Sequence, residues 1–121
     1  MNVETWKTEI KRAANDIGTY KDAFDPVVDA LAKILEQRDA VYEQYIAEGA
    51  HPIVKKTSDR GAVNDTKNPL LVIWDNLNGT ALAYWKELGL TPAGLKRIKD
   101  GIAKEDSKGS ALVKALTKMN V

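Results

Sequence analysis

The sequence lacks cysteine, has one histidine and one phenylalanine, and has no apolar run of the roughly 20 residues that a membrane-spanning helix needs. Without cysteine there is no disulfide, no thiolate nucleophile and no cysteine-ligated zinc. The start of the chain also lacks a basic segment followed by an apolar one, the pattern of a secretory signal peptide. We therefore expect a cytosolic protein without a membrane segment.

Residues that support catalysis are equally scarce. The single histidine, His51, follows Glu48 at a three-residue spacing, but Gly49 between them would end a helix, so we predict no metal site. No glycine-rich phosphate loop is present, and Ser and Thr lie mainly at predicted helix caps or in links. Acidic pairs such as Asp22 and Asp25 lie on polar faces, whereas general acid-base catalysis needs a buried acid. We predict no enzyme activity and no cofactor.

The composition is that of one folded domain, but the charge is unevenly distributed. The chain has 121 residues, 44% hydrophobic and 29% charged, with a formal net charge of +1. Residues 1–48 carry six Lys and Arg against ten Asp and Glu, whereas residues 91–121 carry seven against three and residues 49–67 four against two. An anionic partner would approach the middle and the carboxyl-terminal third. Alternatively, these charges only solvate the surface.

Apolar residues spaced three and four apart predict helices, because this spacing places them on one helical face. Prolines after polar capping residues mark the starts, and glycines mark the ends. We predict helices at about residues 3–17, 26–48, 69–88 and 92–100. Asp25, Asn68 and Thr91 are the predicted N-caps, and Gly18 is predicted to break the first helix.

The segment between the second and third helices, residues 50–67, reads "AHPIVKKTSDRGAVNDTK". We predict a long loop, and loops of this length tend to be functional or mobile. The alternative is a small hairpin, since "PIVKKT" suits a strand and "DRG" and "ND" suit turns. The predicted fold is all-α. The second and third helices form an antiparallel hairpin within a domain of residues 1–103, and a flexible link with a short amphipathic helix follows at residues 104–121.

Two predicted surfaces follow from this arrangement. The third helix is apolar around much of its circumference, so it must be central or must contact another subunit. Its predicted oligomer interface consists of Leu71, Trp74, Leu82 and Trp85. The basic residues of the loop and of the segment after Thr91 would neutralise nucleic-acid phosphates. This predicted DNA-binding set consists of Lys55, Lys56, Arg60, Lys67, Lys96, Arg97 and Lys99.

A series of helix-capping motifs resembles a known family. In order, they are "DPVVDALAKIL", "YEQYIAEG", a polar loop, "KNPLL" and "LGLTPAGLKRI". Over roughly residues 3–100, this series closely resembles the small subunit of tailed-phage terminases. The resemblance implies a helical protomer that assembles as a ring in the host cytoplasm. It also implies a protein that binds viral double-stranded DNA to initiate packaging and recruits the large terminase subunit, the ATPase and nuclease.

The chain departs from the family pattern after the Thr-Pro pair. Many relatives continue with small polar residues and an arginine, whereas here Ala93, Gly94 and Leu95 precede the basic pair Lys96-Arg97.

The amphipathic segment around Leu112, Lys114 and Leu116 is the predicted docking site for the large subunit. The alternative functions are a small helical dimeric DNA-binding regulator and a scaffold that binds only protein.

Overall fold

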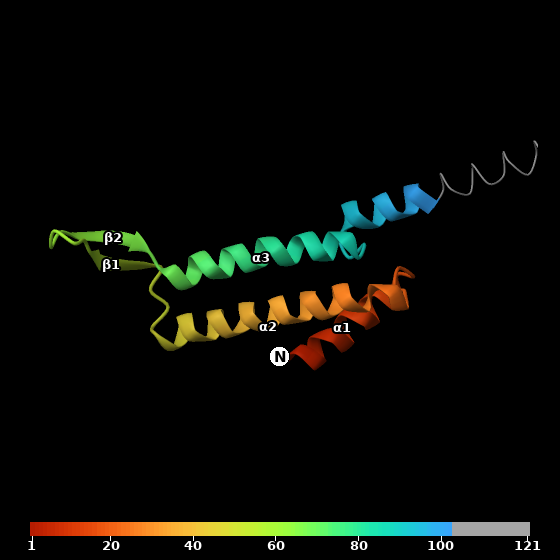
Figure 1. Ribbon diagram of the computed structural model, residues 1–121, viewed down its shortest axis with the longest axis horizontal. Coiled ribbons are helices and arrows are strands. Elements are labelled where there is room, and N and C mark those ends of the chain that lie inside the picture. The colour runs from red at the N-terminus through yellow and green to blue at the C-terminus, as the bar shows by residue number, and fades with distance from the viewer. Residues whose placement is uncertain (103–121) are drawn as a thin grey trace, which may run out of the picture. The chain divides into compact units, whose positions relative to one another are not determined.

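The computed structural model describes residues 1–102, so Leu112, Lys114, Leu116 and the helix predicted within 104–121 lie outside the described residues. The chain divides into two compact units, Met1–Tyr84 and a second that begins at Trp85. The predicted boundary near residue 103 lies at the limit of the described residues and stays a prediction. The labelled elements are α1, a 3-10 helix η1, α2, strands β1 and β2, and α3 (Figure 1).

The three long helices end as their glycines predict. The helices are α1 (Val3–Asp16), α2 (Asp25–Ala47) and α3 (Pro69–Glu87). The second residue beyond each end is a glycine with a positive φ, and these glycines are Gly18, Gly49 and Gly89, at φ values of 74°, 102° and 74°. The amide after each of these glycines donates to a carbonyl five residues earlier, the pattern of a Schellman motif. The predicted break at Gly18 is therefore confirmed.

The predicted N-cap at Asp25 is wrong. The 3-10 helix η1 (Asp22–Phe24) leads directly into α2, and Phe24 occupies the cap position without a side-chain hydrogen bond. The Asp25 carboxylate instead pairs with Lys11 of α1 at 2.8 Å. Its hydrogen bond with Lys11 lowers the pKa of Asp25 below the usual value. A residue expected to start α2 thus joins α2 to α1.

The core of the first unit lies between α1 and α2. A second ion pair, Lys7 to Asp29 at 3.6 Å, lies beside this contact. The fully buried side chains are supplied by both helices, and they are Ile10, Ala14, Val28, Leu31, Ala32 and Leu35. In α3, by contrast, only Ala81 is buried among the described residues, although that helix is the most apolar. Burial of apolar area therefore stabilises α1 against α2 far more than it fixes α3.

The predicted helical character of the fold is confirmed in the described residues, but the predicted long loop at 50–67 is wrong, because this segment forms the antiparallel hairpin that was the alternative. Strand β1 (Ile53–Thr57) pairs with β2 (Val63–Lys67), with Ile53 opposite Lys67 and Thr57 opposite Val63. The fold is mostly helical with one small sheet in the described residues. β-branched residues in both strands favour this conformation. Both faces of the hairpin are largely exposed, and charged residues are interspersed along both strands. The sequence therefore lacks the alternation of apolar and polar residues that predicts a strand.

In the second unit, residues 92–102 form a helix close to the end of α3. The hydroxyl of Thr91 accepts a hydrogen bond from the amide of Gly94 at 3.1 Å, which confirms the predicted cap. Gly94 is buried, and a Cβ at this position would lie 2.2 Å from the carbonyl oxygen of Lys86. Only glycine permits so close an approach, so this glycine sets the packing of the corner.

Replacing Gly94 with alanine should destabilise this corner. The added methyl would force the helix away from the Lys86 carbonyl, at a cost of roughly 1–3 kcal/mol or more in the free energy of unfolding. The matched variant is Gly101→Ala in the same helix, where a Cβ would meet nothing within 4 Å. That change should stabilise by about 0.5–1 kcal/mol. Urea unfolding followed by circular dichroism measures both, and equal effects would contradict the proposed close contact.

Candidate nucleic-acid and assembly interfaces

The structure divides the seven predicted DNA-binding residues between the two units. Lys55 and Lys56 lie on β1, Arg60 in the turn, and Lys67 at the end of β2. The other three, Lys96, Arg97 and Lys99, lie on the helix at residues 92–102 and are exposed. The predicted set is therefore two separate basic elements, one in each unit.

Two of these seven cations are engaged with carboxylates in the protein itself. Lys67 forms an ion pair with Asp75 of α3, and Arg97 lies 3.3 Å from Glu87. Among residues 1–102, the other five form no ion pair with a carboxylate. Sequence alone does not reveal this distinction, because each of the two pairs depends on the path of the chain between its members. The cations available to an anionic partner are thus mainly at the hairpin and at Lys96 and Lys99.

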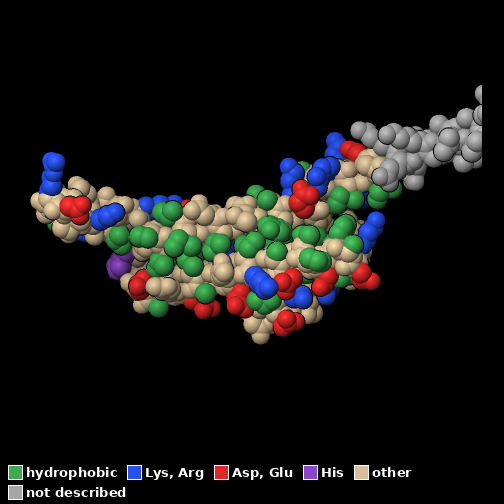
Figure 2. All heavy atoms as spheres, in the orientation of Figure 1, with side chains coloured by type: hydrophobic (Ala, Val, Ile, Leu, Met, Phe, Trp, Pro, Cys, Tyr) green, Lys and Arg blue, Asp and Glu red, His purple; other side chains and the backbone are tan. Residues whose placement is uncertain are grey.

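Lys55 and Lys56 lie on opposite faces of the hairpin. In the register, Lys55 is opposite Asp65 and Lys56 is opposite Asn64. Residues directly opposite share a face, and successive residues alternate between faces. Figure 2 shows Lys and Arg side chains at this hairpin, with acidic side-chain atoms beside them. The hairpin therefore presents a cation on each of its two faces.

Asn68 joins the hairpin to α3. Its backbone amide donates to the carbonyl of Pro52 at 2.8 Å, and its side-chain amide donates to the carbonyl of His51 at 2.9 Å. Its side-chain oxygen accepts from the amide of Leu70 at 3.0 Å, which confirms the predicted N-cap. The residue is 7% exposed. One asparagine thus closes the base of the hairpin and starts the helix.

Two substitutions at Asn68 separate these roles. Asn68→Ala removes the cap and the side-chain hydrogen bond to His51 but keeps the backbone hydrogen bond to Pro52, and we expect it to lower the free energy of unfolding by roughly 1–3 kcal/mol. Asn68→Asp keeps the capping oxygen but loses the donor to His51, so its cost should be smaller. Denaturant unfolding measures stability, and amide exchange in residues 53–67 reports the hairpin. If Asn68→Asp proved as costly as Asn68→Ala, the retained cap would fail to offset the lost donor and the repulsion between the new carboxylate and the His51 carbonyl.

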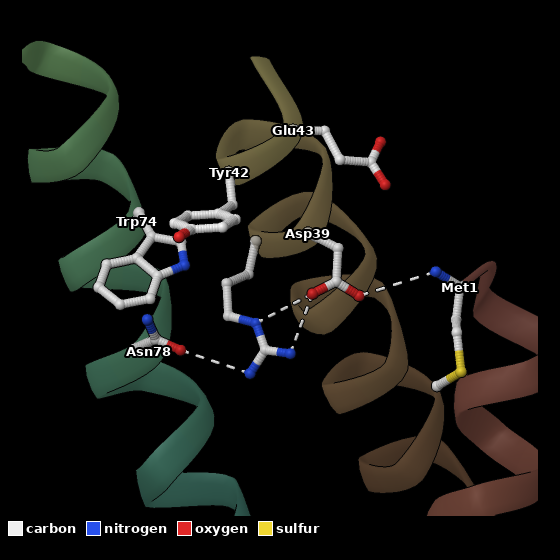
Figure 3. A pocket seen from close by; sticks show the side chains of 7 residues that line it. Met1, Asp39, Tyr42, Glu43, Trp74 and Asn78 are labelled. Carbon is white, nitrogen blue, oxygen red and sulfur yellow. Dashed lines mark hydrogen bonds and ion pairs between the residues drawn. The ribbon is translucent and has the colours of Figure 1, made fainter. Parts of the chain in front are cut away.

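Polar groups and two aromatic rings join α2 to α3. The rings of Tyr42 and Trp74 lie 5.7 Å apart, and the guanidinium of Arg38 donates to Asn78 at 3.4 Å. Arg38 contacts Asn78, whereas Tyr42, one turn later in α2, contacts Trp74, one turn earlier in α3. The two helices are therefore antiparallel. Arg38 also donates to Asp39 at 3.0 Å (Figure 3). In the sequence, Arg38 only interrupts the series of apolar residues in the helix predicted at 26–48. The sequence therefore does not predict its contacts with α3.

Asp39 extends the same cluster to α1. Its second oxygen accepts from the indole nitrogen of Trp6 at 2.9 Å, and Arg38 lies 5.5 Å from the centre of that indole ring. A cleft of about 300 Å³ opens here, lined by Met1, Arg38, Asp39, Tyr42, Glu43, Trp74 and Asn78. Hydrogen bonds depend on direction as well as distance. The bonds of Asp39 with α1 and of Arg38 with α3 therefore align both helices against α2.

The predicted oligomer interface is only partly exposed, and exposed residues outside it extend the apolar surface. Leu71, Trp74 and Trp85 are half-buried, whereas Leu82 is 59% exposed. Four large exposed side chains lie outside the predicted set, namely Tyr42 and Ile46 on α2 and Val72 and Ile73 on α3. In Figure 2 hydrophobic side chains gather along α2 and α3 on the face in view. The signal available in the sequence was the wide series of apolar residues in the helix predicted at 26–48, from which no interface was predicted.

Within residues 1–102, no group of three or more His, Cys, Asp or Glu side chains is placed to hold a metal ion. No described helix has both the length and the apolar character needed to cross a bilayer.

Comparison with known proteins identifies a family. Residues 4–105 match the model of a family described as "Phage terminase, small subunit". Neither a search of curated proteins nor a search of solved structures gave a match. The matched range includes α1, α2, the hairpin, α3 and the helix at residues 92–102.

Proposed function

The chain belongs to the phage terminase small-subunit family, and we propose that it binds viral double-stranded DNA to initiate genome packaging and recruits the large terminase subunit. Small subunits of this family are generally non-catalytic and regulatory, which leaves the ATPase and nuclease to the large subunit. One observation carries the proposal: the first unit combines a basic hairpin with an uncovered apolar surface on α2 and α3. The hairpin suits an anionic polymer, and the apolar surface suits assembly.

The apolar surface favours a homo-oligomer. Tyr42 and Ile46 on α2 and Ile73 and Leu82 on α3 are each more than two-fifths exposed. Soluble monomers rarely leave large contiguous apolar patches uncovered. A head-to-tail contact between copies closes into a ring when its rotation permits, and a ring would present the basic elements several times to one DNA molecule. We therefore propose a ring that includes Leu71, Trp74, Leu82 and Trp85 at its subunit contacts.

Substituting Leu82 with glutamate tests this assembly. The side chain is 59% exposed, so the change should affect protomer stability little but should place an unpaired charge in the proposed contact. Native mass spectrometry should show a wild-type oligomer and a shift toward smaller species for Leu82→Glu. The control is Asn76→Glu at an exposed position of the same helix. A monodisperse wild-type monomer at micromolar concentration would overturn the ring.

The second unit supplies an additional phosphate contact. Lys96 and Lys99 are exposed and lie three residues apart on a helix, so their side chains project about 60° from one another. Arg97 remains part of the proposed contact, but Glu87 already balances its charge in the protein. Contacts of this kind position DNA without reading its sequence.

Removing these two lysines should reduce the salt dependence of DNA binding. Each neutralised phosphate contributes about 0.9 to the slope of log affinity against log salt concentration, so Lys96→Ala with Lys99→Ala should lower the slope by up to about two. Arg97→Ala is the control and should have a smaller effect, because Glu87 competes for the guanidinium. Fluorescence anisotropy with a labelled duplex measures the slope. If the wild-type protein bound no duplex at low salt, DNA binding itself would be excluded.

The proposed docking site for the large subunit is the segment with Leu112, Lys114 and Leu116. Its support is the amphipathic spacing of the sequence, in which apolar residues alternate with lysines four positions apart. A helix this short is marginal in water, so binding to a partner would stabilise it.

A further inference from the structure

We propose that the β-hairpin enters the major groove of DNA with its own turn leading. In this binding mode Lys55 and Lys56 contact the phosphates of the two groove walls, and Arg60 contacts the base edges. This inference rests on the proposed DNA-binding function and assigns it a binding mode. Under this mode the hairpin reads sequence, whereas Lys96 and Lys99 contact only the backbone.

The dimensions of the hairpin suit the major groove. Each strand has five residues, which gives a length of about 16 Å at the usual rise per residue. The major groove is about 12 Å wide and 8.5 Å deep and accommodates a two-stranded ribbon. The minor groove, about 6 Å wide in undistorted DNA, would have to be widened to accept two strands with their side chains, which costs deformation energy. The hairpin is therefore long enough to reach the groove floor while its base stays outside.

The two lysines are placed to contact opposite walls of the groove. Lys55 and Lys56 project from opposite faces of the ribbon, and both are exposed. Neither forms an ion pair with a carboxylate in residues 1–102, although Asp65 lies opposite Lys55. A ribbon inserted by its turn directs its two faces toward the two walls, which are the phosphate backbones. Each lysine then meets one strand of the duplex.

The turn places Arg60 at the end of the hairpin. The amide of Ser58 donates to the carbonyl of Ala62 at 2.7 Å, and the amide of Gly61 donates to the carbonyl of Ser58 at 2.9 Å. Gly61 has a φ of 82°, as the last residue of a three-residue hairpin turn requires. Asp59 and Arg60 are thus the two central residues of the tip. An arginine here can donate two hydrogen bonds to the O6 and N7 atoms of guanine.

The base of the hairpin is held in place before any DNA binds. Asn68 hydrogen-bonds the carbonyls of His51 and Pro52, and Lys67 forms its ion pair with Asp75 of α3. These contacts fix how the ribbon leaves the helices of its own unit. Because this order exists in the free protein, binding does not need to create it, and the entropy cost of binding is smaller.

The first experiment measures phosphate contacts with a labelled duplex of random sequence. We expect Lys55→Ala and Lys56→Ala each to lower the salt slope by about 0.9, and the double variant by about twice that amount. The control is Lys21→Ala, which removes an exposed lysine outside the hairpin and should leave the slope unchanged. Lys55→Gln with Lys56→Gln repeats the test with polar side chains and should give the same loss as the alanine pair.

The second experiment tests base reading by Arg60. The probe is the same duplex pool synthesised with 7-deazaguanine, which lacks the N7 acceptor in the major groove. The wild-type protein should bind this pool at least several-fold more weakly than the natural pool, and Arg60→Ala should bind both equally. Arg60→Lys retains the charge but not the planar fork, so it should keep the salt slope and lose most of the discrimination.

The outcomes separate this inference from the proposed function. If duplex binding persists with an unchanged salt slope in the Lys55 and Lys56 double variants, the groove-wall contacts are overturned while DNA binding stands. Equal effects of 7-deazaguanine on wild type and Arg60→Ala would overturn base reading by the tip. Absence of wild-type binding to any duplex at low salt would remove the proposed function and the inference together.

Discussion

The hydrogen bonds of Asn68 determine how the hairpin and α3 are joined. This buried residue closes the base of the hairpin through Pro52 and His51 and caps α3 through Leu70. A two-stranded hairpin is marginally stable by itself in water. Attachment to a helix start therefore gives the basic ribbon a defined direction that its own strands would not maintain.

The first unit uses two different kinds of contact to hold its helices. Apolar burial dominates between α1 and α2, whereas α3 is held to α2 by Arg38, Asn78 and the ring contact of Tyr42 with Trp74. Hydrogen bonds such as that of Arg38 with Asn78 add little net stability, because they replace hydrogen bonds to water. Much of the apolar surface of α3 consequently stays available. A helix with such a surface is suited to gain its remaining packing from a neighbouring copy.

Much of the helical fold followed from single residues in the sequence, because glycine after a helix and asparagine or threonine before it act locally. Gly18, Asn68 and Thr91 were interpreted correctly for this reason. The hairpin was only the alternative to a long loop, since its strands lack an alternating apolar face. The engagement of Lys67 with Asp75 and of Arg97 with Glu87 also required the folded chain. The sequence predicted which residues are basic, and the structure showed which of them are already paired.

The hairpin has one unpaired edge on each strand in the described residues, and this has a consequence for self-association. Free strand edges can pair with other chains, and lysine on or near an edge opposes such pairing by charge repulsion and by its hydration. Lys55 and Lys56 therefore disfavour strand-to-strand aggregation. The proposed association of copies through the apolar surface of α2 and α3 would then meet no competition from pairing between hairpins.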